Sequence, residues 1–338
     1  MSSHSTAAPQ HTRLIIIGSG PAGYTAAVYA ARAMLKPWLI SGFEPGGQLM
    51  ITTDVENYPG FAAAIQGPWL MEQMKAQAEH VGTRMIGDHI TEVKIERAAD
   101  PSRVIELTGD SGARYTCDAL IIATGAKAKW LGEPSEEKFK GYGVSACATC
   151  DGFFYRGKDV IVVGGGNSAV EEALYLSHLA RSVTVVHRRD SFRAEKILQE
   201  RLFRSANVKV LWNTGVDEIC GASDPPGVTH VRLKSTIDGA LSEVKVEGVF
   251  IAIGHAPAVE LFKDKVAFKP NGYILTAPDS TRTDVPGVFA AGDVTDDIYR
   301  QAVTAAGMGC MAALEAERWL SARAADEAKA AQELRAAE

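Results

Sequence analysis

The sequence predicts an α/β fold built from two doubly wound domains of three layers each, with the second domain inserted into the first. An apolar, strand-like run followed by a glycine-rich turn and a helix-like stretch occurs twice, at residues 14–34 and 160–179. Each copy ends in another apolar run that closes on glycine, at 119–125 and 248–254. Continuous apolar runs separated by helices are typical of parallel strands covered on both faces.

The C-terminal part of the chain predicts the insertion. After the second copy, the chain continues without a third glycine-rich turn into an Ala-rich stretch that predicts a helix from Ala302 to Ala322. This segment is too short to form a domain alone, so we expect it to complete the first one. The predicted domains are 12–127 plus 256–320 and 128–255, with hinges at the two crossing points, 125–129 and 254–257.

Both ends of the chain carry little pattern. Residues 1–11 are polar and lack the charged and apolar regions of a secretory signal, which predicts a disordered tail and a cytoplasmic protein. Residues 321–338 are rich in Ala, Glu and Arg, and predict a helical or frayed continuation of the last helix.

Composition excludes several classes of partner. The chain has 338 residues, a hydrophobic share of 46% and a net charge of −6. This length predicts roughly two domains, and the hydrophobic share is sufficient for a buried core. The negative charge disfavours a nucleic acid held by a basic face. No apolar run approaches the ~20 residues that a membrane-spanning helix needs, so we expect no membrane partner.

The first glycine-rich turn has the GxGxxG pattern of a dinucleotide site. Its glycines permit a tight turn and let the backbone approach a pyrophosphate at the helix N-terminus. The next strand is predicted at Trp38–Ile40, and Glu44 beyond it is placed to accept hydrogen bonds from an unphosphorylated ribose. A purely structural tight turn is the alternative. The turn consists of Gly18, Ser19, Gly20, Pro21, Ala22 and Gly23.

The second turn, GGGNSA at 164–169, has Ala in place of the third glycine. Its second strand, Val183–Val186, ends in a basic cluster instead of an acid. Guanidinium groups suit a 2′-phosphate, which predicts NADPH over NADH, although a solvated charged face is the alternative. Opposite ribose chemistry indicates two different nucleotides, FAD in the first copy and NADPH in the second. The basic cluster is His187, Arg188, Arg189 and Arg193.

One pair among the five cysteines has the spacing of a redox motif. Cys147 and Cys150 form CxxC, and Asp151 follows directly. A zinc site needs four ligands, and no second CxxC or nearby His supplies them, so we expect no metal. Two thiols at this spacing can close a reactive disulfide. Asp151 is then a candidate acid/base, with a helix N-cap as the alternative. Cys117, Cys220 and Cys310 are predicted to be buried or half-buried bystanders.

The sequence resembles the low-molecular-weight, bacterial-type thioredoxin reductases of the pyridine nucleotide-disulfide oxidoreductase family. The motifs above carry the resemblance, together with the segments GGQL, ENYPGF, CATCDGFFYRGK, HRRDSFR and YRQAVTAAGMG. The resemblance runs from about Arg13 to Leu320. It implies a homodimer in which each chain has a Rossmann-like FAD domain and an inserted Rossmann-like NADPH domain. Ser168, where many members have Thr, and the extended C-terminal tail depart from the pattern.

The resemblance also implies a reaction. NADPH reduces FAD, FAD reduces the Cys147–Cys150 disulfide, and the dithiol reduces the disulfide of thioredoxin. Cys150 is then adjacent to the flavin, Cys147 attacks the partner and Asp151 donates a proton. The NADPH domain is expected to rotate between the half-reactions, and Phe153 and Phe154 to contact thioredoxin. A reductase of another small disulfide protein, an oxygen-using flavin dithiol oxidase and a redox-sensing flavoprotein remain as alternatives.

Residue by residue, the resemblance extends both nucleotide sites. Asp293 is expected to accept a hydrogen bond from the flavin ribitol, and Arg300, Gln301 and Ala302 to open a helix whose N-terminus stabilises charge on the reduced flavin. The further expected FAD contacts are Gly42, Phe43, Glu44, Gly46, Gly47, Gln48, Leu49, Asn57, Ala123, Thr124, Gly125 and Gly292. The expected NADPH contacts are Gly164, Gly166, Asn167, Ser168, Ala169, His187, Arg188, Arg189, Arg193, Ile253 and Gly254.

Overall fold

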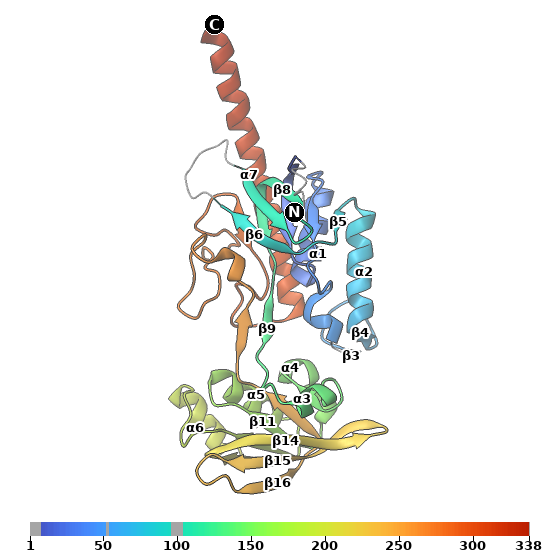
Figure 1. Cartoon of the computed structure of the whole chain (residues 1–338), viewed down its shortest axis with the longest axis vertical. Helices are drawn as coiled ribbons and strands as arrows, with labels where there is room; N and C mark the ends of the chain where they lie inside the picture. Colours follow the sequence, from blue (N-terminus) through green and yellow to red (C-terminus); the bar gives the residue numbers. More distant parts are fainter. Residues whose placement is uncertain (1–7, 52–53, 96–103, 338) are drawn as a thin grey trace, which may run out of the picture. The chain divides into compact units, whose positions relative to one another are not determined.

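The computed structural model describes residues 8–51, 54–95 and 104–337. The chain divides into two compact units, one formed by Met1–Lys127 and Pro257–Glu338 and the other by Ala128–Ala256. The second unit is therefore inserted into the chain of the first. We call them unit 1 and unit 2 (Figure 1). Assigning FAD to unit 1 and NADPH to unit 2 stays a prediction at this point.

Unit 1 is built on a seven-stranded sheet in the order β5-β2-β1-β8-β7-β6, with β19 also paired to β8. The strands β5, β2, β1, β8 and β19 are parallel, whereas β7 and β6 join as antiparallel neighbours. Their bounds are β1 Gln10–Ile17, β2 Trp38–Ile40, β5 Arg84–Ile86, β6 Ile90–Lys94, β7 Ile105–Gly109, β8 Arg114–Ile122 and β19 Val288–Ala290.

Alternate residues of β1 pack into the two different cores of unit 1. Leu14 and Ile16 join the cluster that contains the alanines of α1 (Pro21–Arg32) and α7 (Ala302–Ala337), and these two helices pack against each other (Figure 1). Ile15 and Ile17 join the opposite cluster, which holds Phe262 and Ile274. The sheet is therefore covered on both faces, as the continuous apolar runs predicted. The smaller elements are η1 Gly47–Ile51, β3 Asp54–Val55, β4 Ile65–Gln66, α2 Gly67–His80 and η3 Glu260–Phe262.

At the N-terminus the first strand begins earlier than the expected tail allows, and at the C-terminus the last helix extends to the end of the described residues. β1 begins at Gln10, so residues 10 and 11 are not part of a tail. The reason is pairing with β8, where Gln10 is opposite Tyr115 and His11 Nδ1 lies 3.1 Å from the Thr116 hydroxyl. Residues 1–7 of the predicted tail lie outside the described residues. At the other end, α7 continues to Ala337, as expected for an Ala-rich segment.

Unit 2 contains a five-stranded parallel sheet in the order β10-β17-β11-β12-β13 and a three-stranded antiparallel sheet, β14-β15-β16. One face of the parallel sheet packs against α5, and the other against β14 and β15. The strands are β10 Val144–Ser145, β11 Asp159–Val163, β12 Ser182–Val186, β13 Val208–Leu211, β14 Thr214–Ser223, β15 Pro226–Ser235, β16 Leu241–Lys245 and β17 Gly248–Ile251. The helices are α3 Pro134–Phe139, α4 Ala148–Asp151, η2 Gly152–Tyr155, α5 Asn167–Ser177 and α6 Lys196–Arg204.

The two chain segments that cross between the units pair with each other. They form a two-stranded sheet of β9 (Ala126–Ala128) and β18 (His255–Pro257). The α/β class with parallel sheets is confirmed in both units. Within the described residues, no helix combines the length and apolar character needed to cross a membrane.

Candidate active site

The first glycine turn is enforced by backbone contacts. A Cβ at Gly18, where φ is +109°, would lie 2.1 Å from the carbonyl oxygen of Ala123. A Cβ at Gly23 would lie 1.9 Å from the carbonyl oxygen of Gly18. By contrast, a Cβ at Gly20 would meet nothing within 4 Å, and no side chain caps the N-terminus of α1 there. Packing therefore requires glycine at positions 18 and 23. Gly20 instead leaves open space in front of the uncapped N–H groups of α1.

Three further predicted FAD segments meet this turn at the carboxyl ends of the parallel strands. The Ser19 hydroxyl accepts a hydrogen bond from Gly46 N–H at 3.2 Å, and a Cβ at Gly47 would lie 3.4 Å from Cα of Gly20. A Cβ at Gly292 would lie 2.9 Å from Cβ of Ala22. The segments around Gly18, Gly46, Ala123 and Gly292 thus come together within unit 1.

Other predicted FAD residues have partners within the protein. Glu44 is exposed and forms an ion pair with Lys127 at 2.9 Å. The Phe43 ring stacks on His89, with 4.2 Å between the ring centroids. Thr124 donates its hydroxyl to the carbonyl of Ala258 at 2.7 Å. Gly42 and Gly125 lie on loops after β2 and β8, and Gln48 and Leu49 lie in η1. Asn57 is exposed on the loop between β3 and β4.

Asp293 is a half-buried acid at this edge, next in space to the buried Asp296. Desolvation and, to a smaller extent, the Asp296 carboxylate together raise its pKa to about 7 against the opposing effect of Arg300. A half-buried carboxyl group beside a glycine turn is placed to bond a polyol hydroxyl. Such a group is expected where a ligand displaces water.

The sequence did not reveal the role of Asp296, which fixes the chain before α7. Its carboxylate accepts hydrogen bonds from the N–H groups of Ile298, Tyr299 and Arg300 at 3.0, 2.9 and 3.0 Å. Arg300 has φ +51°, a left-handed conformation, and Ala302 then begins α7 as predicted. The available signal was an Asp placed two to four residues before the consecutive N–H groups of a loop that leads into a predicted helix.

The second glycine turn is shaped partly by a side chain. A Cβ at Gly164 would lie 2.3 Å from the carbonyl oxygen of Ala252, and one at Gly165 would lie 2.2 Å from the His187 ring. Gly166 faces open space and precedes α5, whose N-terminus no side chain caps. Arg193 N–H donates to the carbonyl of Gly165 at 2.8 Å, so the basic loop is attached to this turn.

His187 carries an unsatisfied polar atom at this site. The residue is 6% exposed, and Nε2 has no hydrogen-bond partner within the described structure. Its ring packs near Phe192 and Trp212, with centroid distances of 5.6 and 6.2 Å. Burial lowers the pKa of His187, and nearby arginines lower it further. An orphaned nitrogen beside a glycine turn is what a bound ligand atom would satisfy.

The three predicted arginines lie close to His187, the residue that shapes this turn. Arg188, Arg189 and Arg193 are exposed, and none forms an ion pair with a carboxylate in the described part of the chain. Asn167 instead pairs with the backbone of Glu195 at 2.9 Å. Ser168 and Ala169 follow in the first turn of α5, and Ile253 and Gly254 lie on the loop after β17, next to Ala252.

Cys147 and Cys150 are joined by a disulfide, with 5.3 Å between their Cα atoms. Both are half-buried at the short helix α4. Cys147 N–H donates to the Ser145 hydroxyl at 3.0 Å, and the Cys147 carbonyl accepts from Asp151 N–H at 3.1 Å. Among the described residues, no group of three potential metal ligands is assembled. The redox-pair interpretation of CxxC is therefore the one that the geometry supports.

Asp151 does not cap a helix with its side chain, although it ends α4 and precedes η2. Burial raises the pKa of its carboxyl, and a hydrogen bond from Ser145 partly offsets this. A carboxyl group whose pKa is raised keeps its proton to higher pH than an ordinary aspartate, which suits donation to a thiolate. Phe153 beyond it is 54% exposed and Phe154 is half-buried, with an edge-to-face arrangement of the two rings.

The other three cysteines lie apart from this pair in the chain. Cys117 is fully buried in β8, and burial raises the pKa of its thiol above the usual range. Cys220 lies within β14 and Cys310 within α7, and both are half-buried free thiols. Their burial is as predicted; that they take no part in the reaction stays a prediction.

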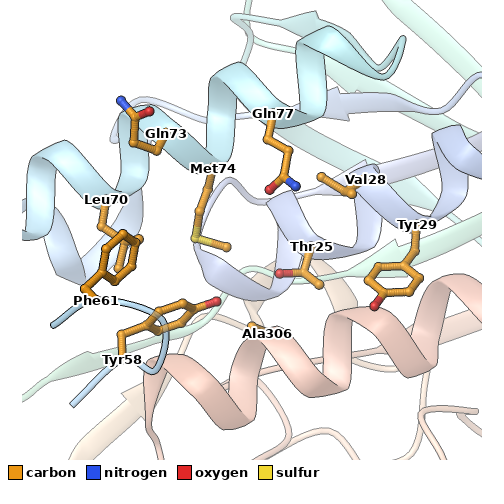
Figure 2. A pocket seen from close by; sticks show the side chains of 10 residues that line it. All are labelled: Thr25, Val28, Tyr29, Tyr58, Phe61, Leu70, Gln73, Met74, Gln77 and Ala306. Atoms are coloured by element: carbon orange, nitrogen blue, oxygen red, sulfur yellow. The ribbon is translucent and has the colours of Figure 1, made fainter.

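Unit 1 also has a cavity of about 350 Å³ that no motif predicted (Figure 2). It lies between α1, α2 and the start of α7, with the rings of Tyr58 and Phe61 at one side (Figure 2). Phe61 packs edge-to-face on Trp69, and both are about two-fifths exposed. The lining residues are Thr25, Val28, Tyr29, Tyr58, Phe61, Leu70, Gln73, Met74, Gln77 and Ala306.

Comparison with known proteins identifies the family. The profile described as pyridine nucleotide-disulphide oxidoreductase matches residues 12–309. A thioredoxin reductase of Rickettsia conorii is 58% identical over 310 residues, which cover 92% of this chain and 98% of the relative. A Pseudomonas fluorescens relative named glucosaminate ammonia-lyase is 57% identical over 318 residues, covering 92% of this chain and 96% of the relative. A solved thioredoxin reductase of Giardia duodenalis is 42% identical, with a TM-score of 0.87, and covers 92% of this chain and 99% of that structure. The chain therefore belongs to the pyridine nucleotide-disulphide oxidoreductase family.

Proposed function

We propose that this chain is an NADPH-dependent thioredoxin reductase that uses FAD. The observation that carries the proposal is the half-buried Cys147–Cys150 disulfide followed directly by the half-buried Asp151. A dithiol-disulfide couple needs two accessible sulfurs and a proton source, and both are present here. The relatives named thioredoxin reductase support the same reaction.

The residues fit both nucleotides. In unit 1, Gly20 leaves open space before the uncapped N-terminus of α1, and Asp293 offers a half-buried carboxyl to a polyol hydroxyl. In unit 2, Gly166 offers the same kind of space, and the nearby His187 has three arginines around it that form no ion pair with any carboxylate among the described residues. The orphaned Nε2 of His187 would gain a partner from a bound phosphate. We therefore assign FAD to unit 1 and NADPH to unit 2.

The protein's own part in the reaction lies in the cysteine pair. When bound, the two nucleotides supply the two electrons that open the disulfide. The two sulfurs then take up two protons, one of which Asp151 is placed to deliver. Cys147 as thiolate attacks the disulfide of thioredoxin, forming a mixed disulfide and releasing one partner thiol. Cys150 attacks Cys147 in turn, which restores the Cys147–Cys150 disulfide and releases reduced thioredoxin.

We also propose that unit 2 rotates about the paired segments β9 and β18 between the half-reactions. Only these two short strands carry the chain between the units. Hinges are commonly a few such residues at element ends, and motions of this kind occur on the μs–ms timescale. A cross-link that fixes the units should abolish steady-state turnover. Normal turnover by the cross-linked protein would disprove the rotation.

Partners follow from exposed apolar surface. We infer that Phe153 and Phe154 contact thioredoxin, since the exposed ring of Phe153 and the half-buried ring of Phe154 pack edge-to-face a few residues after Cys150. We further infer a homodimer in which the apolar rim of the unit 1 cavity, including Tyr29 and Phe61 (Figure 2), meets a second copy together with the exposed Trp69, which packs on Phe61. Sedimentation should then give about twice the chain mass of 36.1 kDa. A cytoplasmic location suits a catalytic rather than structural CxxC.

The relative named glucosaminate ammonia-lyase makes a second activity worth testing. Loss of ammonia from an amino sugar acid is an elimination without net oxidation, so it would leave the disulfide and the basic cluster without a role. The reductase is therefore the better supported function. Reduction of a different small disulfide protein, and oxidation of a dithiol by oxygen, use the same cysteines and are separated by assay.

The test is NADPH consumption by the flavin-loaded protein with thioredoxin, with another small disulfide protein, with oxygen alone and with glucosaminate, the last also assayed for ammonia. We expect rapid consumption only with thioredoxin. The Cys147→Ser variant should still accept electrons from NADPH, seen as bleaching of the flavin, but lose thioredoxin reduction almost entirely. Unchanged thioredoxin reduction by this variant would remove CxxC from the mechanism.

A further inference from the structure

A turn at residues 269–273, remote in sequence from the glycine motifs, contacts the segment that carries Asp293 and Arg300. Lys269 Nζ lies 2.5 Å from Oδ1 of Asp297 and 2.7 Å from the carbonyl oxygen of Thr295. Asn271 Nδ2 donates to the other carboxylate oxygen of Asp297 at 2.6 Å. Both oxygens of this carboxylate are therefore engaged by the same turn. The side chains of Lys269 and Asp297 are only about a quarter exposed.

Backbone bonds attach this turn to the same segment. Ile274 N–H donates to the carbonyl of Val294 at 3.0 Å, and the Thr295 hydroxyl donates to the carbonyl of Ile274 at 2.9 Å. The turn is itself closed by Lys269 N–H, which donates to the carbonyl of Tyr273 at 2.8 Å. Ile274 and Val294 are completely buried. The turn thus holds residues 294–297 by main chain and side chain together.

The turn holds residues 294–297, which lie between Asp293 and Arg300, two of the predicted flavin contacts. Asp293 precedes Thr295 by two residues, and Asp296, whose carboxylate binds three successive N–H groups, is next to Asp297. The last of these N–H groups belongs to Arg300, whose left-handed φ of +51° must be maintained by its surroundings. The hydroxyl of Tyr273, in the same turn, accepts a hydrogen bond from the Arg300 side chain. Holding Asp297 in place therefore also holds the backbone on which Asp293 and Asp296 are carried.

We propose that Lys269, Asn271 and Asp297 form a positioning clamp that holds Asp293 and the 296–300 segment in the arrangement that receives FAD. The proposal rests on the FAD site proposed above. These three residues act through Asp293 and Asp296, not as catalytic groups. Because the ion pair is partly buried and makes a further bond to Thr295, its removal releases more than an exposed surface pair would.

The test compares Lys269→Met, Asp297→Asn and the double variant with wild type. The dissociation constant of FAD from the flavin-free full chain is measured by quenching of flavin fluorescence. We expect each single variant to weaken FAD about tenfold, and the double variant to weaken it no more than either single one, because the two residues act as one pair. Lys269→Arg, which keeps the charge, should bind FAD within about threefold of wild type.

A matched control and a second readout separate positioning from general destabilisation. Arg114 and Glu106 form an exposed ion pair in the same unit, and Arg114→Met should change FAD affinity less than twofold. Hydrogen exchange of the flavin-free chain should accelerate about tenfold at the N–H groups of residues 298–300 in Asp297→Asn, while the amides of β1 and β8 stay unchanged.

FAD affinity and 298–300 exchange equal to wild type in Lys269→Met and Asp297→Asn would overturn the clamp. If Lys269→Met does not accumulate as folded protein, Asp297→Asn carries the same comparison. A wild-type chain that does not bind FAD would disprove the proposed function, whereas the exchange measurement would still decide whether the clamp exists.

Discussion

The two glycine turns follow one plan but are enforced differently. In unit 1, a Cβ at the third position, Gly23, would lie 1.9 Å from a backbone oxygen. In unit 2, that position is Ala169, whose Cβ is accommodated and completely buried. Backbone against backbone therefore sets the distance between strand and helix in unit 1, and a methyl group sets it in unit 2. The third glycine of the motif is a packing requirement that depends on the neighbouring backbone.

The two units also differ in the charged residues that follow the second strand of each sheet, β2 in unit 1 and β12 in unit 2. In unit 1 the acid Glu44 is already paired with Lys127, and both side chains are exposed. In unit 2 the guanidiniums are unpaired among the described residues, and His187 Nε2 lacks a partner. The second site thus presents uncompensated positive charge, whereas the charge of the first is compensated. A dianionic phosphate is the ligand that this difference favours in unit 2.

The largest expected effect tests the close contact in unit 1. Gly23→Ala should destabilise the protein by about 3 kcal/mol and abolish FAD retention, because the clashing atom is a backbone oxygen that cannot rotate away. Urea unfolding and the flavin content of purified protein measure this. Gly20→Ala is the control: it should fold normally, since its Cβ meets nothing, yet bind FAD more weakly. Normal FAD content in Gly23→Ala would contradict the close contact.

A second prediction uses opposite pH dependences. The folded-state pKa of Asp293 is raised to about 7, so between about pH 4 and 7 the folded state holds a proton that the unfolded state has lost. The stability of flavin-free unit 1 should therefore fall as pH rises through this window, by a few kcal/mol in order of magnitude. Chemical unfolding at pH 5 and pH 8 measures it, and Asp293→Asn should flatten the dependence.

His187 should give the opposite trend in unit 2. Its folded-state pKa is lowered, so just below pH 6.5 the unfolded state binds a proton that the folded state does not. Unit 2 should therefore lose stability as the pH falls below about 6.5. His187→Phe should remove this loss. Probes specific to each unit, Trp38 in unit 1 and Trp212 in unit 2, separate the two dependences. Parallel pH trends in both units would contradict the comparison.

The sequence could predict the motifs that are local and could not predict what depends on distant residues. Strand, turn and helix are consecutive at 14–34 and at 160–179, so their order alone indicated each turn. The antiparallel sheet β14–β16 follows no such local motif in the sequence and was not predicted. The Lys269–Asp297 pair joins residues on two separate loops, which no local pattern indicates. Phe43 was expected at FAD, and its stacking on His89 depends on a loop far along the chain.

The next prediction concerns charge in unit 2. Replacing Arg188 and Arg189 by Gln should raise KM for NADPH about 150-fold, since two charge-assisted bonds to a phosphate contribute about 3 kcal/mol together even at about 1.5 kcal/mol each. KM for NADH should change less than threefold, because NADH lacks the 2′-phosphate. Replacing Arg181, which is paired with Asp159 in the same unit, is the matched control and should affect neither coenzyme. Equal losses with both coenzymes would disprove the phosphate assignment.

The smallest expected effect comes from changing the third position of the glycine turn in unit 2. Ala169→Gly gives unit 2 the third glycine that unit 1 needs. It should cost only about 1 kcal/mol, because a helix loses roughly that on replacing Ala by Gly, and it should leave KM for NADPH within twofold. The reason is that Ala169 packs toward Gly164, where its Cβ lies 2.7 Å from the place that a Cβ of Gly164 would take, and not toward the open space at Gly166. Urea unfolding and coenzyme kinetics measure the two quantities. A large loss of NADPH binding in this variant would mean that the methyl group shapes the phosphate site itself, and that the two turns differ in binding as well as in packing.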